Sequence, residues 1–169
     1  MSARRVLVIG SQAIHAFHRD PPIAVVFGSR EVDVTPLPYA DFDRWYFYVH
    51  EHFGADSEFD IEHGVYIDMV KEGIPKFPSG WETRAIERSL DMNEPGQSVT
   101  VVYPEIYDLL ITKLLVNRDQ DEVFLKGVAQ ITTLDADTLR ARLDSVVLTR
   151  EKEHRRVWAR ECVRRVFAG

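Results

Sequence analysis

Two acidic residues in one short segment are the first candidates for chemistry. Glu31 and Asp33 alternate with apolar residues in Glu31–Leu37, a pattern that predicts a strand with one buried face. Residues two apart on a strand project from the same face, so the two carboxylates are expected to lie close together. A divalent cation offsets such repulsion, and Mg²⁺ prefers sites where one or two carboxylates act with substrate phosphate oxygens. The pair therefore predicts a Mg²⁺ (or Mn²⁺) centre for phosphoryl or nucleotidyl transfer.

A third acid, Asp68, lies in another alternating segment, Val65–Val70, which predicts a second strand. If the two strands pair, Asp68 lies beside Asp33, where it would act as a third metal ligand or as the general base. The alternative is structural, because acids alternate with apolar residues on many exposed strand faces that carry out no chemistry.

A phosphate site is expected where the first strand ends. The apolar run Val6–Ile9 predicts a buried strand, and Gly10 and Ser11 follow it at the start of a helix predicted over Ser11–His18. Glycine lets the backbone approach a ligand closely, and free amides at a helix start attract phosphate. The Ser11 hydroxyl adds a donor. An ordinary helix cap is the alternative interpretation.

Lys113 is predicted on the apolar side of a long helix that begins at Pro104 and runs to about Gly127. At 100° per residue, Lys113 and Asp121 fall on one stripe with large apolar residues. A buried lysine needs a partner, so Lys113 is expected to bind a nucleotide phosphate or a strand carboxylate. An internal salt bridge without chemistry is the alternative. Arg118 points away from this stripe and is expected at the surface.

Periodicity and chain breakers predict the elements that position these residues. Besides those above, they are a loop or edge strand at 23–27, an amphipathic helix at 39–54, a short helix or irregular crossing at 81–90, a strand at 98–103, a helix from about 135, and a last helix over 149–167. The aromatic stripe of the helix at 39–54 is expected to pack in the core; it consists of Phe42, Trp45, Tyr46, Val49 and Phe53. The fold class is therefore α/β (α+β), a mixed sheet flanked by helices, with further helices at the C terminus. Residues 1–130 are expected to form the core and 131–169 a helical extension of the same compact unit.

Composition narrows the class of protein. A chain of 169 residues with a net charge of −6 is not expected to be built only to coat nucleic acid. The lone Cys162 excludes an internal disulfide, and no apolar run is long enough to cross a membrane, so a soluble cytoplasmic protein is expected. The arginine-bearing C-terminal part is either a nucleic-acid surface or a solvated helix with internal ion pairs. His50 and His52, two apart on a helix, are not expected to share a metal.

Three stretches, Val6–Ile14, Ser29–Val34 and Tyr103–Asp121, resemble nucleotidyltransferase-fold proteins related to AbiEii-type toxins. The resemblance implies a nucleotidyltransferase-like sheet. It also implies a Gly-Ser turn for the nucleotide phosphates at Gly10 and Ser11, and a metal-binding acid pair. A helix lysine, followed by an Arg/Lys-x-x-Asp segment that ends at Asp121, completes the implied site. The chain departs from the pattern at Glu31, where many members have aspartate.

Together these features predict a Mg²⁺-dependent nucleotidyltransferase that moves a nucleoside monophosphate from a nucleoside triphosphate (NTP) to a hydroxyl acceptor. The acceptor would be an RNA such as tRNA, or a protein. The resemblance adds a toxin role and an antitoxin partner. The alternative is a catalytically inactive module of the same fold that acts as an antitoxin or interaction partner, in which Glu31 and Lys113 form an internal ion pair.

Overall fold

A mixed β-sheet forms the centre of the molecule. The structure is a computed structural model that describes residues 5–22, 26, 28–91 and 97–167. Within these residues the strand order is β3-β2-β1-β5-β4. The strands are β1 (Arg5–Ile9), β2 (Glu31–Leu37), β3 (Tyr66–Met69), β4 (Ile86–Asp91) and β5 (Ser98–Tyr103). β1 runs antiparallel to β2 and parallel to β5, β2 and β3 are parallel, and β4 and β5 are antiparallel.

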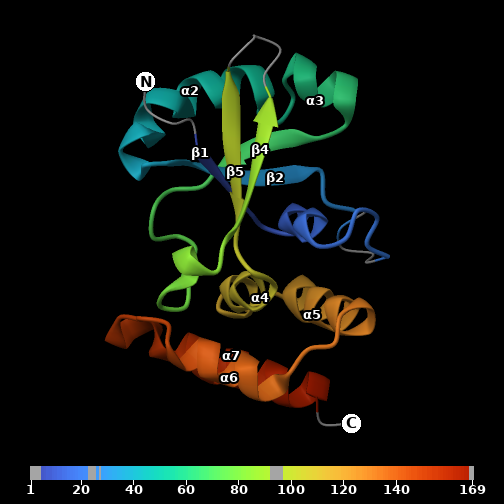
Figure 1. The fold of residues 1–169 in the computed structure, drawn as a ribbon, viewed down its shortest axis with the longest axis vertical. Coiled ribbons are helices and arrows are strands. Elements are labelled where there is room, and N and C mark those ends of the chain that lie inside the picture. The colour runs from blue at the N-terminus through green and yellow to red at the C-terminus, as the bar shows by residue number, and fades with distance from the viewer. Residues whose placement is uncertain (1–4, 23–25, 27, 92–96, 168–169) are drawn as a thin grey trace.

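Helices cover the sheet at both ends of the molecule, which confirms the predicted mixed sheet with flanking and C-terminal helices. The α-helices are α2 (Phe42–Phe53), α3 (Glu58–His63), α4 (Ile106–Leu114), α5 (Asp119–Ile131), α6 (Ala136–Asp144) and α7 (Glu153–Phe167). Short 3₁₀ helices are η1 (Gln12–Ala16), η2 (Tyr39–Asp41), η3 (Trp81–Thr83) and η4 (Arg150–Lys152). In Figure 1, α2 and α3 lie across the upper part of the sheet, α4 and α5 lie below it, and α6 and α7 form the lowest layer. No helix of the described residues is long and apolar enough to cross a membrane.

The core has two parts, one on each side of the central strand β1. The larger cluster joins α4, α5, α6 and α7 to η1, and Val8 packs against it. The smaller cluster is built on Leu7, Ile9 and Val102, and the segment 70–85 covers it with Phe77 and Trp81. Because successive side chains of β1 enter opposite clusters, the apolar run that predicted this strand is explained by burial on both faces.

The long helix predicted from Pro104 to Gly127 is wrong, because the chain forms two helices there. α4 ends at Leu114, Asn117 has a φ of +62°, and α5 begins at Asp119. Asparagine tolerates the left-handed conformation better than most residues, and it allows the chain to change direction between the two helices. A helical wheel does not show this break, since it assumes one continuous helix; the run of polar residues at 117–122 marks its position.

The segment 81–90, predicted as a short helix or an irregular crossing, begins with the short 3₁₀ helix η3, but strand β4 from Ile86 onward was missed. Five of its six residues are exposed, so the sequence shows no alternation that would indicate a strand. The helix predicted over 11–18 is the short 3₁₀ helix η1, and the Ser11 side chain makes no cap hydrogen bond. The prediction for 23–27 falls, apart from Val26, outside the described residues.

Helix α2 is confirmed, but its aromatic stripe is not core packing as predicted. Phe42 is buried, whereas Trp45 is 40% exposed and Tyr46, Val49 and Phe53 are only partly buried. The helix packs on β3, which is an outer strand of the sheet and covers only one side of the helix. The C-terminal helices α6 and α7 confirm the predictions at 135 and 149–167, and the Asp135 carboxylate caps α6 by accepting from the amides of Asp137 and Thr138.

Candidate metal centre

Three carboxylates meet where β2 and β3 lie side by side. The two strands are parallel, and their register places Asp33 opposite Asp68 and Glu31 opposite Tyr66. One carboxylate oxygen from each of Glu31, Asp33 and Asp68 lies within 4.8 Å of the other two. The predicted neighbourhood of Asp68 and Asp33 is therefore confirmed, while the roles of the three acids stay predictions.

Gly10 makes room for one of these carboxylates. It follows β1, whose last residue Ile9 pairs with Asp33, and it has a φ of +72°. A Cβ atom at residue 10 would lie 1.8 Å from Oδ2 of Asp33, far inside contact distance. Sequence reasoning predicted that the backbone at Gly10 approaches a phosphate. The structure shows that it approaches the Asp33 carboxylate, and the phosphate role stays a prediction.

The electrostatics of the three acids favour a cation. Burial and, to a smaller extent, the charge of Glu31 together raise the pKa of Asp33 to about 6, while the charge of Lys113 opposes the rise. Burial also raises the pKa of Glu31, and the charge of Asp68 adds to this effect. Burial therefore makes a negative charge costly at this site in the absence of a cation. Three close carboxylate oxygens are the hard ligands that Mg²⁺ and Mn²⁺ prefer, so these residues fit a divalent cation.

Lys113 lies beside the acids and is itself buried, with 8% of its surface exposed. Its Nζ is 3.8 Å from Oδ1 of Asp121 and 4.6 Å from the centre of the Phe124 ring. Burial lowers the pKa of Lys113, and the charge of Asp121 offsets part of this effect. The two residues meet because α5 turns back after Asn117, and not because they share one helix face as the sequence interpretation held.

Arg118 is exposed, as predicted, and it also belongs to this site through its contacts with Asp121. Its Nε and Nη2 donate to the two carboxylate oxygens of Asp121, each at 3.1 Å, and its backbone amide donates to the same side chain. Its charge opposes the rise in the pKa of both Glu31 and Asp33.

A cavity of about 520 Å³ opens beside the acids, a size typical of small-molecule sites. It is lined by Ser11, Gly28, Ser29, Arg30, Glu31, Tyr66, Lys113 and Gln120. Sequence reasoning identified Ser11, Glu31 and Lys113 and missed the others. Ser29 and Arg30 directly precede Glu31, and this adjacency is the signal that would have indicated them.

Hydrogen bonds fix the rim of this cavity. The hydroxyl of Ser11 donates to that of Ser29 at 3.1 Å, and the Gln12 amide donates to the Ser29 carbonyl at 2.6 Å. Arg30 donates to the Gly64 carbonyl at 3.1 Å and forms an ion pair with the buried Asp60 of α3. The cavity is therefore framed by the β1–η1 turn on one side and by α3 on the other.

A family model described as a nucleotidyltransferase of unknown function (DUF6036) matches residues 5–167. The chain belongs to this nucleotidyltransferase family. No curated protein and no solved structure matches it. The match extends from β1 to α7, so the acids, the lysine helix and the C-terminal helices all lie within the matched residues.

The remaining candidate residues contact groups other than the three acids. His50 and His52 contact different rings of α2, those of Tyr46 and Tyr48. Four arginines of α7 are paired with carboxylates, which fits the alternative of a solvated helix with internal ion pairs. The pairs are Arg156 with Glu153, Arg160 with Asp144, Arg164 with Glu161, and Arg165 with Glu122.

Proposed function

We propose that the chain is a Mg²⁺-dependent (or Mn²⁺-dependent) nucleotidyltransferase that transfers a nucleoside monophosphate from an NTP to a hydroxyl acceptor. One observation carries the proposal: carboxylate oxygens of Glu31, Asp33 and Asp68 lie within 4.8 Å of one another beside a cavity that Lys113 also lines. Membership of the nucleotidyltransferase family supports the class of reaction.

Glu31, Asp33 and Asp68 would hold the cation, which when bound neutralises charge on the phosphates and on the attacking oxygen. In the reaction, the acceptor oxygen attacks the α-phosphorus, the bond to the β-phosphate breaks, and pyrophosphate leaves. The hydroxyl proton passes to a carboxylate. We assign it to Asp68, the one of the three acids that lies on the outer strand β3.

The basic side of the site would bind the triphosphate. Lys113 and Ser11 both line the cavity, so an ammonium and a hydroxyl are available to phosphate oxygens, together with the backbone at Gly10. Asp121 contacts both Lys113 and Arg118 and would hold the two cations in position for the ligand.

We further propose an RNA such as tRNA, or a protein, as acceptor. We also propose a toxin role with an antitoxin partner. Both rest on the resemblance of three stretches of the chain to AbiEii-type nucleotidyltransferases. The inactive alternative required an ion pair between Glu31 and Lys113. Lys113 is paired with Asp121 instead, and Glu31 stays with the other acids. The geometry therefore favours the enzyme.

Calorimetric titration of the protein with each of ATP, CTP, GTP and UTP, with and without Mg²⁺, tests the proposal. Metal-dependent binding of at least one NTP is expected, and it should be lost in the double variant Glu31→Gln, Asp33→Asn. The control is a double variant with the same types of substitution at two exposed acids, Glu151→Gln and Asp137→Asn. It should bind the NTP as the wild type does. If none of the four NTPs binds, the enzyme proposal fails. Transfer of labelled nucleotide to total tRNA or to lysate protein then identifies the acceptor.

A further inference from the structure

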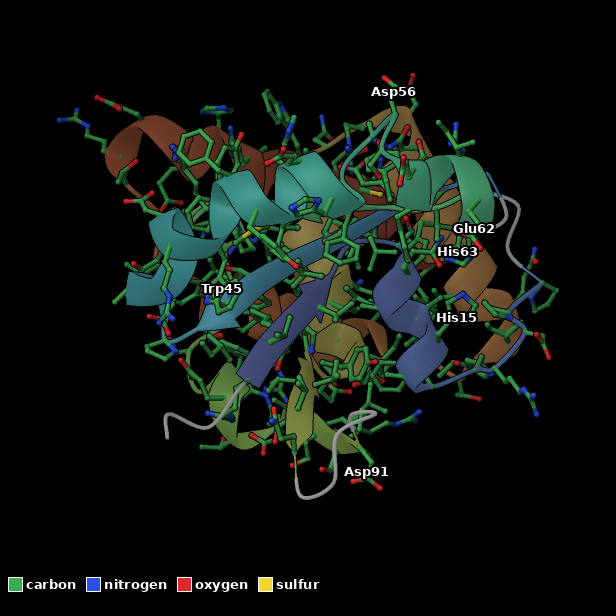
Figure 2. The ribbon with its side chains drawn as sticks, turned by 90° about the horizontal axis from the view of Figure 1, so that it is seen from above. His15, Trp45, Asp56, Glu62, His63 and Asp91 are labelled. Atoms are coloured by element: carbon green, nitrogen blue, oxygen red, sulfur yellow. The ribbon has the colours of Figure 1, made fainter. Side chains whose placement is uncertain are left out.

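Helices α2 and α3 expose an unusual number of large apolar side chains. Phe47 is 78% exposed, Tyr48 51% and Trp45 40% on α2, and Ile61 is 78% exposed on α3. Figure 2 looks onto this side of the molecule, with Trp45 on α2 and Glu62 and His63 on α3. We call the exposed surface of these two helices, within residues 42–63, the α2–α3 face. Gathered apolar groups of this kind mark interaction sites more often than singly scattered ones do.

The aromatic rings of this face form a connected row. The Arg44 guanidinium lies over Trp45, Trp45 contacts Tyr48, and Tyr48 contacts His52 with ring centres 4.5 Å apart. The row continues onto α3 through Phe53 and Phe59, whose ring centres are 5.3 Å apart. Rings held against one another lose little conformational freedom when a partner binds, so they are suited to anchor an interface.

The charge of the α2–α3 face selects the kind of partner. Its exposed carboxylates are Asp43, Glu51, Asp56, Glu58 and Glu62, and Arg44 is its only lysine or arginine. A negative surface repels nucleic-acid phosphates and attracts basic groups. The geometry points to a partner protein that docks here through a segment carrying both arginine or lysine and apolar side chains.

A second copy of the chain fits this face less well. Many of the basic residues that it would offer are on α7, and four of these, Arg156, Arg160, Arg164 and Arg165, are already paired with carboxylates. A contact between α2 of one copy and α7 of another is also heterologous, and such contacts tend toward open chains rather than closed dimers.

The docked partner would lie next to the candidate metal centre. Asp60 of α3 forms an ion pair with Arg30, and Arg30 lines the cavity beside the acids. The proposal does not depend on nucleotidyl transfer, because its test measures binding alone.

The test uses fluorescence anisotropy with a labelled amphipathic helical peptide of leucine and arginine. A leucine–glutamate peptide with the same apolar face and a single-stranded RNA oligonucleotide serve as comparisons. Saturable binding of the cationic peptide is expected, about ten-fold weaker for Trp45→Ala. The matched control is Trp158→Ala on α7, which removes a tryptophan that is 44% exposed and contacts the His154 ring; its affinity should stay within about two-fold of the wild type.

Reversal of one charge on the same face gives an independent variant. Glu51→Lys keeps every aromatic ring and should also weaken binding of the cationic peptide. Three results would overturn the proposal. The first is an affinity for the cationic peptide that Trp45→Ala leaves unchanged. The second is binding of the glutamate peptide or the RNA that is as tight or tighter and that Trp45→Ala weakens equally. The third is self-association, measured in the ultracentrifuge, that Trp45→Ala abolishes.

Discussion

At the scale of single residues, the closest approach in the site is between a glycine and a carboxylate. Gly10 has no side chain, and this is what leaves Asp33 its position beside Glu31 and Asp68, since a Cβ would meet Oδ2 of Asp33 at 1.8 Å. The glycine is needed twice, once for the space and once for its φ of +72°. The two requirements can be separated by experiment.

Gly10→Ala should cost about 1–2 kcal/mol of stability from the backbone conformation alone and should also abolish Mg²⁺ binding, because Asp33 must move. Gly64→Ala is the matched control. Gly64 has a φ of +70°, but no atom lies within 4 Å of the Cβ it would gain. Its variant should lose similar stability and keep metal binding. Thermal unfolding and Mg²⁺ titration measure the two effects, and equal metal affinity in both variants would contradict this account of Gly10.

The raised pKa of Asp33 predicts how the metal-free protein responds to pH. Its folded pKa of about 6 lies above its ordinary value of 3.8, so the folded state binds the proton more tightly than the unfolded state does. The contribution of this group to stability is therefore full below pH 4 and is lost as the pH rises through 6. We expect a loss of about 1–3 kcal/mol over that window.

Chemical denaturation at a series of pH values, without metal, measures this change. Asp33→Asn should remove the dependence and make the metal-free protein more stable than the wild type at pH 8. Mg²⁺ should stabilise the wild type at that pH by mass action and leave the variant unaffected. The prediction fails if the stability of the wild type is constant or rises between pH 4 and 7 and if Asp33→Asn leaves this pH dependence unchanged.

At the scale of elements, a buried carboxylate joins the segment before β4 to two helices. Asp108 of α4 is fully buried, and it accepts from Nε and Nη2 of Arg84 at 2.9 and 3.0 Å. Arg142 of α6 lies 3.6 Å from the same carboxylate. The group thus connects the segment that covers the smaller core cluster with the helices of the larger one.

Asp108→Ala should destabilise the protein by about 3–5 kcal/mol, because it leaves two arginines without their shared partner. Asp144→Ala serves as the control, since it breaks an exposed pair with Arg160 and should cost less than about 1 kcal/mol. Urea denaturation of both variants gives the comparison. If both variants lose a similarly small free energy of unfolding, Asp108 does not stabilise the fold.

The elements also show what a single sequence contains and what it lacks. The alternation of polar and apolar residues indicated β2 and β3, but no alternation indicated β4, whose side chains are nearly all exposed. Glu31 and Asp33 were predictable as neighbours because they share a strand. The place of Asp68 opposite Asp33 depends on the register of strands joined by a long connection, which local spacing does not encode. The ion pair between Arg118 and Asp121 was not predicted for a similar reason, because the left-handed residue Asn117 changes the direction of the chain before it.

At the scale of the whole molecule, the predicted extension at 131–169 supplies part of one shared core. Leu139, Leu143, Ala159 and Val163 are fully buried in the same cluster as Leu109 of α4. A chain that ends at residue 130 should therefore fail to fold, because it exposes the apolar faces of α4 and α5. The full chain should unfold in one transition by near- and far-UV circular dichroism, and a folded 1–130 fragment would show instead that two independent units exist.

The strand order has a consequence for the way in which the site is held together. β3 has only four residues and borders the sheet, so within the described residues β2 is its one strand neighbour. Border strands detach at lower free energy than strands with two neighbours. Detachment of β3 carries Asp68 away from Glu31 and Asp33, so fraying and loss of the three-acid cluster are the same event. A ligand that bridges the three acids would hold β3 against β2, so this border of the sheet would open least often when the ligand is bound.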